Sequence, residues 1–246
     1  GKKMSKSLGN IVEPWEEMNT FGVDALRFFM YSVNQPGDSK NYDPKTVDEI
    51  VKKVFNLLSN VLAFYTLYAG EISHSSVDVR KSPSVLDQWI LAKTDDMVAT
   101  VTDGFEHYQL FEPSRAIREF TADLSQWYVR RSRDRIKGGE AEDRAYALAT
   151  TRTVLLTVSK LLAPLTPFFA ESVYQALAGG KESVHLEEWP ENKLVTHDKQ
   201  PTTILTEMSE VRKLVSLGLE ARMKAKINVR QPLAELRIKI PESRFK

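Results

Sequence analysis

The sequence predicts a mainly α protein, a helical bundle with a short β segment near the C-terminus. Apolar residues recur at steps of three and four over most of the chain, which is the spacing of amphipathic helices. Glycine and proline clusters separate these stretches and leave short connections between them. The alternation that indicates strands is confined to Val184 to Leu186 and Leu236 to Ile240. Apolar stripes of this kind are buried when helices pack together in a bundle.

The first part of the chain predicts short helices followed by a boundary. After a polar loop, residues 14–31 predict two helical pieces that meet at Gly22. Residues 34–44 are rich in turn formers, so we expect a domain boundary there. Asp43 before Pro44 predicts a helix start, because proline is favoured at the first helical position.

The remaining elements are helices separated by glycine or proline. Their apolar stripes predict helices at 45–65, 86–105, 114–137, 140–162, 168–177 and 203–222. The hydroxyl of Ser114 is expected to cap the third of these. Pro164 and Pro167 interrupt the pattern after the fourth, because proline cannot continue a helix interior.

Composition limits the kind of protein. With 246 residues and 42% hydrophobic content, the chain can bury a substantial core. Its 34 basic and 33 acidic residues give a net charge of +1, so a nucleic-acid surface must come from local clustering. The absence of cysteine excludes disulfides and cysteine-ligated zinc, and no zinc site is expected. We see no apolar run of membrane-spanning length and no signal-peptide core, and therefore expect a cytoplasmic protein without a membrane partner.

The polar loop near the start carries chemistry suited to phosphate. Residues 3–10 read Lys-Met-Ser-Lys-Ser-Leu-Gly-Asn. The ammonium groups of Lys3 and Lys6 supply positive charge, and the hydroxyls of Ser5 and Ser7 can donate hydrogen bonds to phosphate oxygens. By composition alone, such a stretch is more often a solvated tail.

The most basic stretch, residues 127–137, divides into two sets by helical phase. At about 100° per residue, Arg131 and Arg135 continue the apolar stripe, so we interpret them as structural residues at the bundle end or paired with acids. Tyr128 lies on the same stripe and is expected in the core.

The opposite side of that helix is the candidate RNA surface. Arg130, Arg133 and Lys137 project there and could meet RNA phosphates, although a basic helix face is often only solvated. Trp127 lies nearer the stripe edge and is either core or a base-stacking residue. A second basic run, residues 222–230, is equally an RNA-facing surface or a solvated helix end.

Two strings carry a resemblance to a known family. Residues 3–7 match, letter for letter, the second catalytic motif of class I aminoacyl-tRNA synthetases. Residues 124–133 resemble a string of the isoleucyl-tRNA synthetase family, with Gln126 replacing the usual asparagine. Further similar strings follow the same order at 22–27, 165–168, 183–190 and 226–233. Valyl- and leucyl-tRNA synthetases share the first loop but not this combination.

The resemblance implies a reaction for the parent protein, in which isoleucine joins its tRNA through an adenylate made from ATP with Mg²⁺. It implies that Lys6 stabilises the activation transition state, that Lys3 supports it, and that Ser5 and Ser7 position the loop on the ATP phosphates. The family's His-x-Gly-His motif is absent from this sequence. We therefore expect a C-terminal fragment that binds no cofactor, is inactive alone, and has a disordered or nonproductively docked loop.

The resemblance also divides the chain and names a partner. It implies the end of a catalytic domain at 1–40, an anticodon-binding bundle at 41–200, and a basic helix with the start of a C-terminal region at 201–246. A monomer that holds isoleucine-specific tRNA is expected, through the four RNA candidates named above. Three alternatives stay open: a valyl- or leucyl-tRNA synthetase fragment, a non-catalytic RNA-binding helical module, and a purely structural helical domain.

Overall fold

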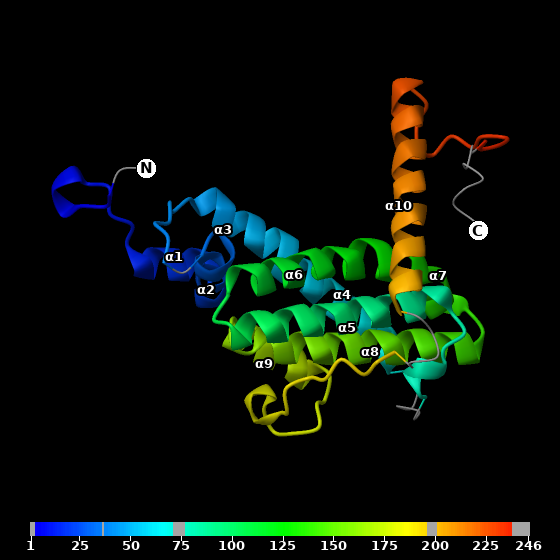
Figure 1. Cartoon of the computed structure of the whole chain (residues 1–246), viewed down its shortest axis with the longest axis horizontal. Coiled ribbons are helices and arrows are strands. Elements are labelled where there is room, and N and C mark those ends of the chain that lie inside the picture. The colour runs from blue at the N-terminus through cyan, green and yellow to red at the C-terminus, as the bar shows by residue number, and fades with distance from the viewer. Residues whose placement is uncertain (1–2, 36, 71–76, 196–200, 238–246) are drawn as a thin grey trace. The chain divides into compact units, whose positions relative to one another are not determined.

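The computed structural model describes residues 3–35, 37–70, 77–195 and 201–237. The chain divides into two compact units, Gly1–Lys199 and Gln200–Lys246. The first unit contains the bundle, and the second contains one long helix (Figure 1).

The first unit is built from helices joined by short connections. Its α-helices are α1 (Pro14–Phe21), α2 (Val23–Ser32), α3 (Pro44–Ile50), α4 (Asn56–Ala69), α5 (Val85–Glu106), α6 (Phe111–Ala122), α7 (Arg130–Gly138), α8 (Ala141–Leu162) and α9 (Pro167–Ala176). Short 3-10 helices lie at Lys6–Leu8, Val79–Lys81 and Val184–Leu186. The described residues contain no strand. The predicted helical bundle is confirmed.

Three local predictions need correction. Val184–Leu186 forms a 3-10 helix instead of a strand, because Ser183 Oγ accepts a hydrogen bond from His185 N–H at 3.2 Å and tightens the chain. The β segment predicted near the C-terminus is not supported, since residues 236–237 are not in a strand and 238–240 lie outside the described residues. Ser114 does not cap its helix, because α6 begins earlier and Ser114 Oγ donates back to the Leu110 carbonyl at 2.7 Å.

Two pairs of helices are each continuous through a π-helical segment. Val51–Phe55 joins α3 to α4, and Asp123–Val129 joins α6 to α7. Asp43 caps the first of these rods as predicted, since its carboxylate accepts a hydrogen bond from Lys45 N–H at 3.0 Å. Pro44 occupies the first turn, also as predicted.

The two rods lie side by side and run parallel. Near their starts, Arg118 Nη2 is 3.7 Å from Glu49 Oε2. Further along, the Arg133 guanidinium lies 5.8 Å from the centre of the Phe64 ring. The C-terminal part of the second rod therefore lies beside α4. Helix α8 packs against both α4 and α7.

The core lies around α5 and α8, each 22 residues long. Large side chains from several helices are fully buried there, including Trp89, Phe120, Tyr128 and Tyr174. Burying an aromatic or aliphatic side chain of this size contributes about 1.5–3 kcal/mol. The bundle therefore depends on these apolar contacts for most of its stability.

One helical stretch is unusually apolar. Pro44–Ala69 spans 26 residues, and an 18-residue window within it reaches a mean hydropathy of 1.2, which is enough by length and composition to cross a membrane. The expectation that no run approaches that length is therefore wrong. One face of the stretch is used inside the bundle, where Val47, Val54 and Leu58 are buried.

The second unit contains α10 (Pro201–Lys224) and a turn that follows it. Arg222 organises that turn by donating hydrogen bonds to the backbone carbonyls of Asn228, Val229 and Gln231, the second at 3.2 Å. The helix predicted at 203–222 is confirmed and extends slightly further.

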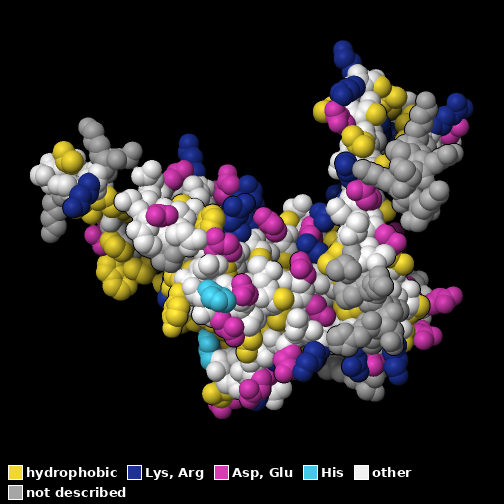
Figure 2. Space-filling model, in the orientation of Figure 1, with side chains coloured by type: hydrophobic (Ala, Val, Ile, Leu, Met, Phe, Trp, Pro, Cys, Tyr) yellow, Lys and Arg dark blue, Asp and Glu magenta, His cyan; other side chains and the backbone are white. Residues whose placement is uncertain are grey.

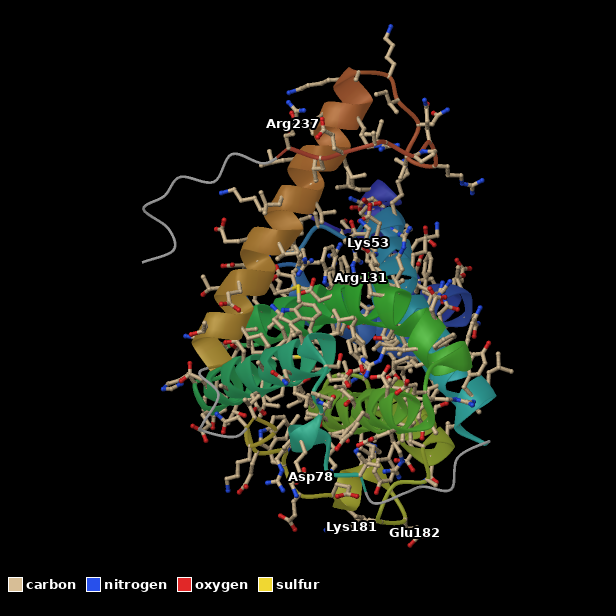
Figure 3. All side chains as sticks on the ribbon, turned by 90° about the vertical axis from the view of Figure 1, so that its right-hand side faces the viewer. Lys53, Asp78, Arg131, Lys181, Glu182 and Arg237 are labelled. Carbon is tan, nitrogen blue, oxygen red and sulfur yellow. The ribbon has the colours of Figure 1, made fainter. Side chains whose placement is uncertain are left out.

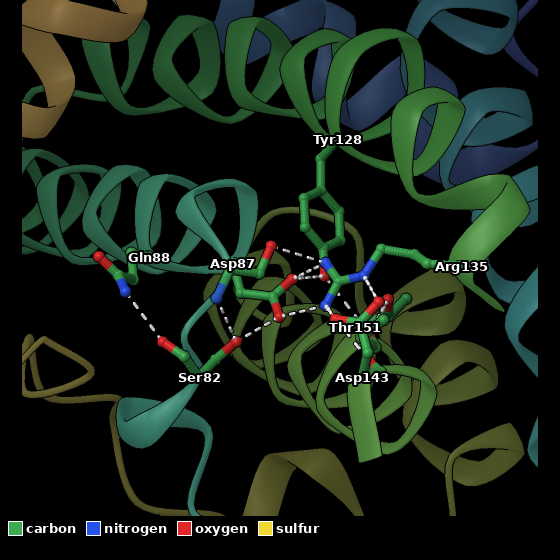
Figure 4. Close-up of polar contacts among 9 residues, drawn as sticks. Ser82, Asp87, Gln88, Tyr128, Arg135, Asp143 and Thr151 are labelled. Atoms are coloured by element: carbon green, nitrogen blue, oxygen red, sulfur yellow. Dashed lines mark hydrogen bonds and ion pairs between the residues drawn. The ribbon is translucent and has the colours of Figure 1, made fainter. Parts of the chain in front are cut away.

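A buried polar network ties α5, α7 and α8 together (Figure 4). Arg135 of α7 contacts both carboxylate oxygens of Asp87 on α5, at 2.8 and 2.9 Å. The same guanidinium contacts Asp143 of α8 at 2.6 and 3.0 Å. Asp87 also accepts hydrogen bonds from the hydroxyls of Tyr128 at 2.7 Å and Ser82 at 2.6 Å. The predictions that Tyr128 lies in the core and that Arg135 pairs with neighbouring acids are confirmed.

Electrostatics favour the protonated forms of two members of this network, Arg135 and Tyr128. Burial alone would lower the pKa of Arg135, but its hydrogen bonds to Asp87 and Asp143 raise that pKa overall. Burial raises the pKa of the Tyr128 hydroxyl well above its ordinary value, and the Asp87 charge adds to the effect. Tyr128 therefore stays a hydrogen-bond donor and Arg135 stays a cation.

Removing the cation should be costly. Arg135→Met should lower the free energy of unfolding by roughly 3–5 kcal/mol, because it leaves the carboxylate of Asp87 buried without its partner. Urea denaturation followed by circular dichroism measures this change. Lys137→Met, at an exposed position of the same helix, is the matched control and should change stability by about 0.5 kcal/mol or less. Equal unfolding free energies for the two variants would contradict the role given to the network.

Candidate functional site

The N-terminal loop is closed by its own hydrogen bonds. Ser5 N–H donates to Asn10 Oδ1 at 2.8 Å, and Asn10 Nδ2 donates to the Lys3 carbonyl at 3.3 Å. The hydroxyls of Ser5 and Ser7 lie 2.7 Å apart. Gly9 has a φ of 62°, a left-handed conformation that glycine adopts without strain. The described residues of the loop thus form a turn closed by its own hydrogen bonds, and the expectation of a disordered or nonproductively docked loop stays a prediction.

Three of the four side chains predicted to meet phosphate lie among the described side chains of this turn. Lys3 and Ser7 are exposed, and Ser5 is half-buried. The side chain of Lys6 lies outside the described residues, so its predicted role is untested. An exposed ammonium group and two adjacent hydroxyls in one loop are residue types that suit phosphate oxygens. Over the described part of the chain, no three His, Asp or Glu side chains gather as a metal site would require.

Two charged side chains of α2 attach this N-terminal segment to the bundle. Asp24 is 8% exposed, and its Oδ2 accepts a hydrogen bond from Phe169 N–H in the first turn of α9, at 2.6 Å. Arg27 donates to the carbonyls of Pro164 and Leu165, just after α8 ends, both at 3.0 Å. Asp24 therefore lies at the N-terminal end of α9, where the partial charge is positive. Arg27 lies at the C-terminal end of α8, where the partial charge is negative. Burial raises the pKa of Asp24, while the Phe169 N–H and Arg27 act against that rise.

The second candidate region is the outer side of α7. Its inner side carries Ser132 and Ile136, which are buried together with Val129 directly before the helix. The outer side, called here the α7 basic face, consists of Arg130, Arg131, Arg133 and Lys137, which are exposed. Asp134 is also exposed among them, so positive charge dominates this face without filling it. The predicted exposure of Arg130, Arg133 and Lys137 agrees with this arrangement, whereas their predicted contact with RNA has no test in the structure.

A π-helical segment decides which side chains reach this face. The prediction that Arg131 continues the buried stripe is wrong, because it assumed one uniform turn of about 100° per residue. The segment Asp123–Val129 is wound with an extra residue per turn, which rotates every later side chain back by roughly one residue's turn. Val129 and Ile136 consequently enter the core, and Arg131 leaves it. The apolar spacing of one sequence gives no sign of such a segment.

Pairs of arginine with an aromatic ring border the α7 basic face. The Arg131 guanidinium lies 3.3 Å from the centre of the Trp127 ring. On the side toward α4, Arg133 lies over Phe64, whose ring centre is 5.0 Å from that of Tyr68. Trp127 is half-buried, which leaves both its core and its base-stacking interpretation open. Planar cations and rings of this kind are chemistry suited to nucleic acid.

Charge elsewhere is mixed. Figure 2 shows Lys and Arg side chains interspersed with Asp and Glu over the visible surface. In Figure 3, Arg131 and Lys53 lie toward one edge of the bundle, while Lys181 and Glu182 lie toward the opposite edge. A nucleic-acid surface must therefore be local, as the net charge predicted.

A surface cavity of about 470 Å³ between α2, α3 and α6 contains two more arginines. Arg115 Nη2 lies 3.9 Å from Glu119 Oε1, and Arg118 Nη2 lies 3.7 Å from Glu49 Oε2. Each guanidinium already has an acidic neighbour, so this cavity offers less positive charge than the α7 basic face.

Comparison with known families gives two matches. Residues 87–240, more than half of the chain, match the family described as the anticodon-binding domain of tRNA ligase. Residues 1–42 match the family described as class I tRNA synthetases (I, L, M and V). The first match contains the α7 basic face, and the second contains the N-terminal loop.

Individual relatives agree with these families. The chain is 38% identical to the isoleucine–tRNA ligase of Deinococcus radiodurans, over 97% of this chain and 22% of that protein. It is 39% identical to the isoleucine–tRNA ligase of Thermus thermophilus, over 98% of this chain and 24% of that protein. The chain thus spans about a quarter of the length of these relatives. A crystal structure of a ternary complex of LeuRS, tRNA and LeuAMS from Agrobacterium radiobacter K84 is similar in fold, with a TM-score of 0.55 and 25% identity, over 78% of this chain and 22% of that one.

The closed N-terminal turn can be tested through its backbone. Asn10→Ala should leave Ser5 N–H without its acceptor and speed its amide exchange by roughly two- to tenfold, since such a hydrogen bond contributes about 0.5–1.5 kcal/mol. Hydrogen exchange measured by NMR reports this amide directly. Asn34→Ala, which removes a different side-chain amide that donates to the Ser39 carbonyl, should leave Ser5 unaffected. An unchanged Ser5 rate in Asn10→Ala would show that this contact does not close the loop.

Proposed function

This chain belongs to the family of anticodon-binding domains of tRNA ligases, and from that premise we propose that it is the tRNA-binding portion of an isoleucine–tRNA ligase. The observation that carries the proposal is the α7 basic face, which lies inside the region matching that family. The name borne by the two relatives favours isoleucine over valine and leucine.

In this proposal, Arg130, Arg133 and Lys137 contact phosphates of the tRNA, and Trp127 lies beside them. Each cation that neutralises a phosphate releases condensed counterions, so binding weakens as salt rises. The face is exposed, and the helix that carries it is held in the bundle because Arg135 pairs with Asp87 of α5 and Asp143 of α8. The backbone of the face therefore needs no ordering when RNA binds.

The N-terminal part belongs to the same proposal. Residues 1–40 end a catalytic domain, 41–200 form the anticodon-binding bundle, and 201–246 begin a C-terminal region. Supporting this division, large apolar side chains are exposed near the loop, with Trp15 at 70%, which suits a surface covered by further protein. We take the full-length protein to be a cytoplasmic monomer.

The catalytic part of the proposal concerns ATP and Mg²⁺, which together supply the activated phosphate for adenylate formation. Lys3 and Lys6 would hold the phosphates by charge, and Ser5 and Ser7 would donate hydrogen bonds to them. The donors described for Lys3, Ser5 and Ser7 fit such an anion. The chain alone is proposed to bind tRNA without catalysing this reaction.

The tRNA contact makes a prediction about salt. Replacing Arg130, Arg133 and Lys137 together by glutamine should reduce the slope of log affinity against log salt by roughly 2–3, since each phosphate contact contributes about 0.7–0.9. Fluorescence anisotropy with labelled tRNA at several salt concentrations measures the slope.

The matched control removes three cations from other segments. Arg80, Lys181 and Lys193 are replaced by glutamine, and the slope should stay at its original value. The proposal fails if the α7 variant also keeps the original slope. If the unaltered chain itself scarcely binds tRNA, the alternative of a purely structural helical domain is favoured instead.

The catalytic role is tested in the full-length protein. Lys6→Ala should slow adenylate formation by about 10²–10³-fold and leave isoleucine binding unchanged, because the charge is aimed at the transition state. Isoleucine-dependent pyrophosphate exchange gives the rate, and calorimetry gives the binding. Lys45→Ala, an exposed lysine outside the loop, should retain the full rate. An undiminished rate in Lys6→Ala would remove the catalytic assignment.

A further inference from the structure

Trp127 and Arg131 form an unusually close stacked pair. The Arg131 guanidinium carbon lies 3.3 Å from the ring centre, whereas the other arginine–aromatic pairs described lie at 5.3–5.8 Å. At so short a distance the guanidinium must lie nearly parallel to the indole, because a tilted group would push one of its nitrogens into the ring. The contact therefore holds a planar cation flat at the edge of the α7 basic face.

The helix winding places this pair where it lies. The π-helical segment ends at Val129, between the two residues, and it turns Arg131 out of the core onto the same edge as Trp127. Arg131 is exposed, and Trp127 beneath it is half-buried. The indole is thus anchored in the bundle and supports a guanidinium at the surface.

We propose that the Trp127–Arg131 pair is a stacking platform for an unpaired base of the RNA, and that Arg131 is a base-contacting residue. The proposal rests on the proposed function, since it gives the α7 basic face a second mode of contact with tRNA. Bases in single-stranded loops are recognised by stacking on aromatic rings and on guanidinium planes. The indole fixes the guanidinium beforehand, so a base that stacks on it need not order a flexible side chain.

The neighbouring side chains suit this assignment. Arg130 directly precedes Arg131, and Arg133 lies toward the other edge of the same face. These cations can hold the phosphates on either side of a base, which positions the strand while the platform receives the base. Stacking of this kind tolerates different bases. The platform therefore contributes affinity for an unpaired nucleotide and does not select which base is bound.

The test combines protein variants with RNA variants, as in a double-mutant cycle. The full chain is titrated by fluorescence anisotropy with an anticodon stem–loop RNA and with copies that each lack one loop base. For the unaltered chain, one abasic position should weaken binding by on the order of tenfold, the size expected for one stacked base. Arg131→Met should weaken binding of the intact loop by a similar factor, and the same abasic position should then cause little further loss.

Two more variants sharpen the result. Arg131→Lys keeps the charge but loses the plane, so it should keep the salt slope and still lose the effect of the abasic position. Arg115→Met, which removes an arginine lying 5.3 Å from the Phe111 ring on α6, is the matched control and should behave like the unaltered chain. Circular dichroism melting checks that each variant is folded.

The inference is overturned if the abasic scan has the same profile in the unaltered chain, Arg131→Met and Arg131→Lys, because the pair would then serve packing alone. It is equally overturned if no loop position matters to the unaltered chain. The salt slope of the Arg130, Arg133 and Lys137 variant tests the proposed function separately, so failure of the platform and failure of the tRNA surface give different results.

Discussion

The bidentate contact between Arg135 and Asp87 is the constraint on which the arrangement of α7 depends. Asp87 is fully buried, so its charge requires a cation held at close range. Only one rotation of α7 about its axis satisfies that requirement while Asp143 on α8 takes the other side of the guanidinium. Once this rotation is fixed, the residues that face solvent are fixed as well. The exposed chemistry of α7 is therefore determined from the inside of the bundle.

Much of this could be predicted from the sequence, because helical periodicity and capping are local signals. The bundle, the start of α3 at Asp43 and the burial of Tyr128 follow from spacing and side-chain chemistry alone. The failures have local causes that spacing does not reveal. Ser114 binds back to a carbonyl within an already started helix, and Ser183 folds a short alternating segment into a 3-10 helix. For the candidate site, the residue types in the loop and on α7 indicated which side chains suit phosphate. The exposure of Arg131 could not be predicted in this way, because it depends on a change of helical winding.

The contacts that attach α2 to the connection between α8 and α9 could not be predicted from local signals. Sequence reasoning marked the stretch containing Asp24 and Arg27 only by resemblance, since their partners lie far away in the chain. Both partners are backbone groups at helix ends, so the attachment depends on the conformation of that corner and not on the identity of its side chains. The N-terminal segment and the bundle are thereby joined at a point where two helices change direction.

The π-helical segment before α7 also bears on which sequence changes the chain can accept. The wider turn accommodates one more residue than a regular helix does, so the extra residue lies between Asp123 and Val129 while α7 keeps its facing. Deleting one residue there would restore regular winding and still leave Arg135 toward Asp87 and Arg131 toward solvent. The same deletion in a regular helix would turn every later side chain by about 100°. Relatives that differ by one residue in length at this stretch, with the same residues facing the core afterwards, are the evolutionary signature that such a segment should leave.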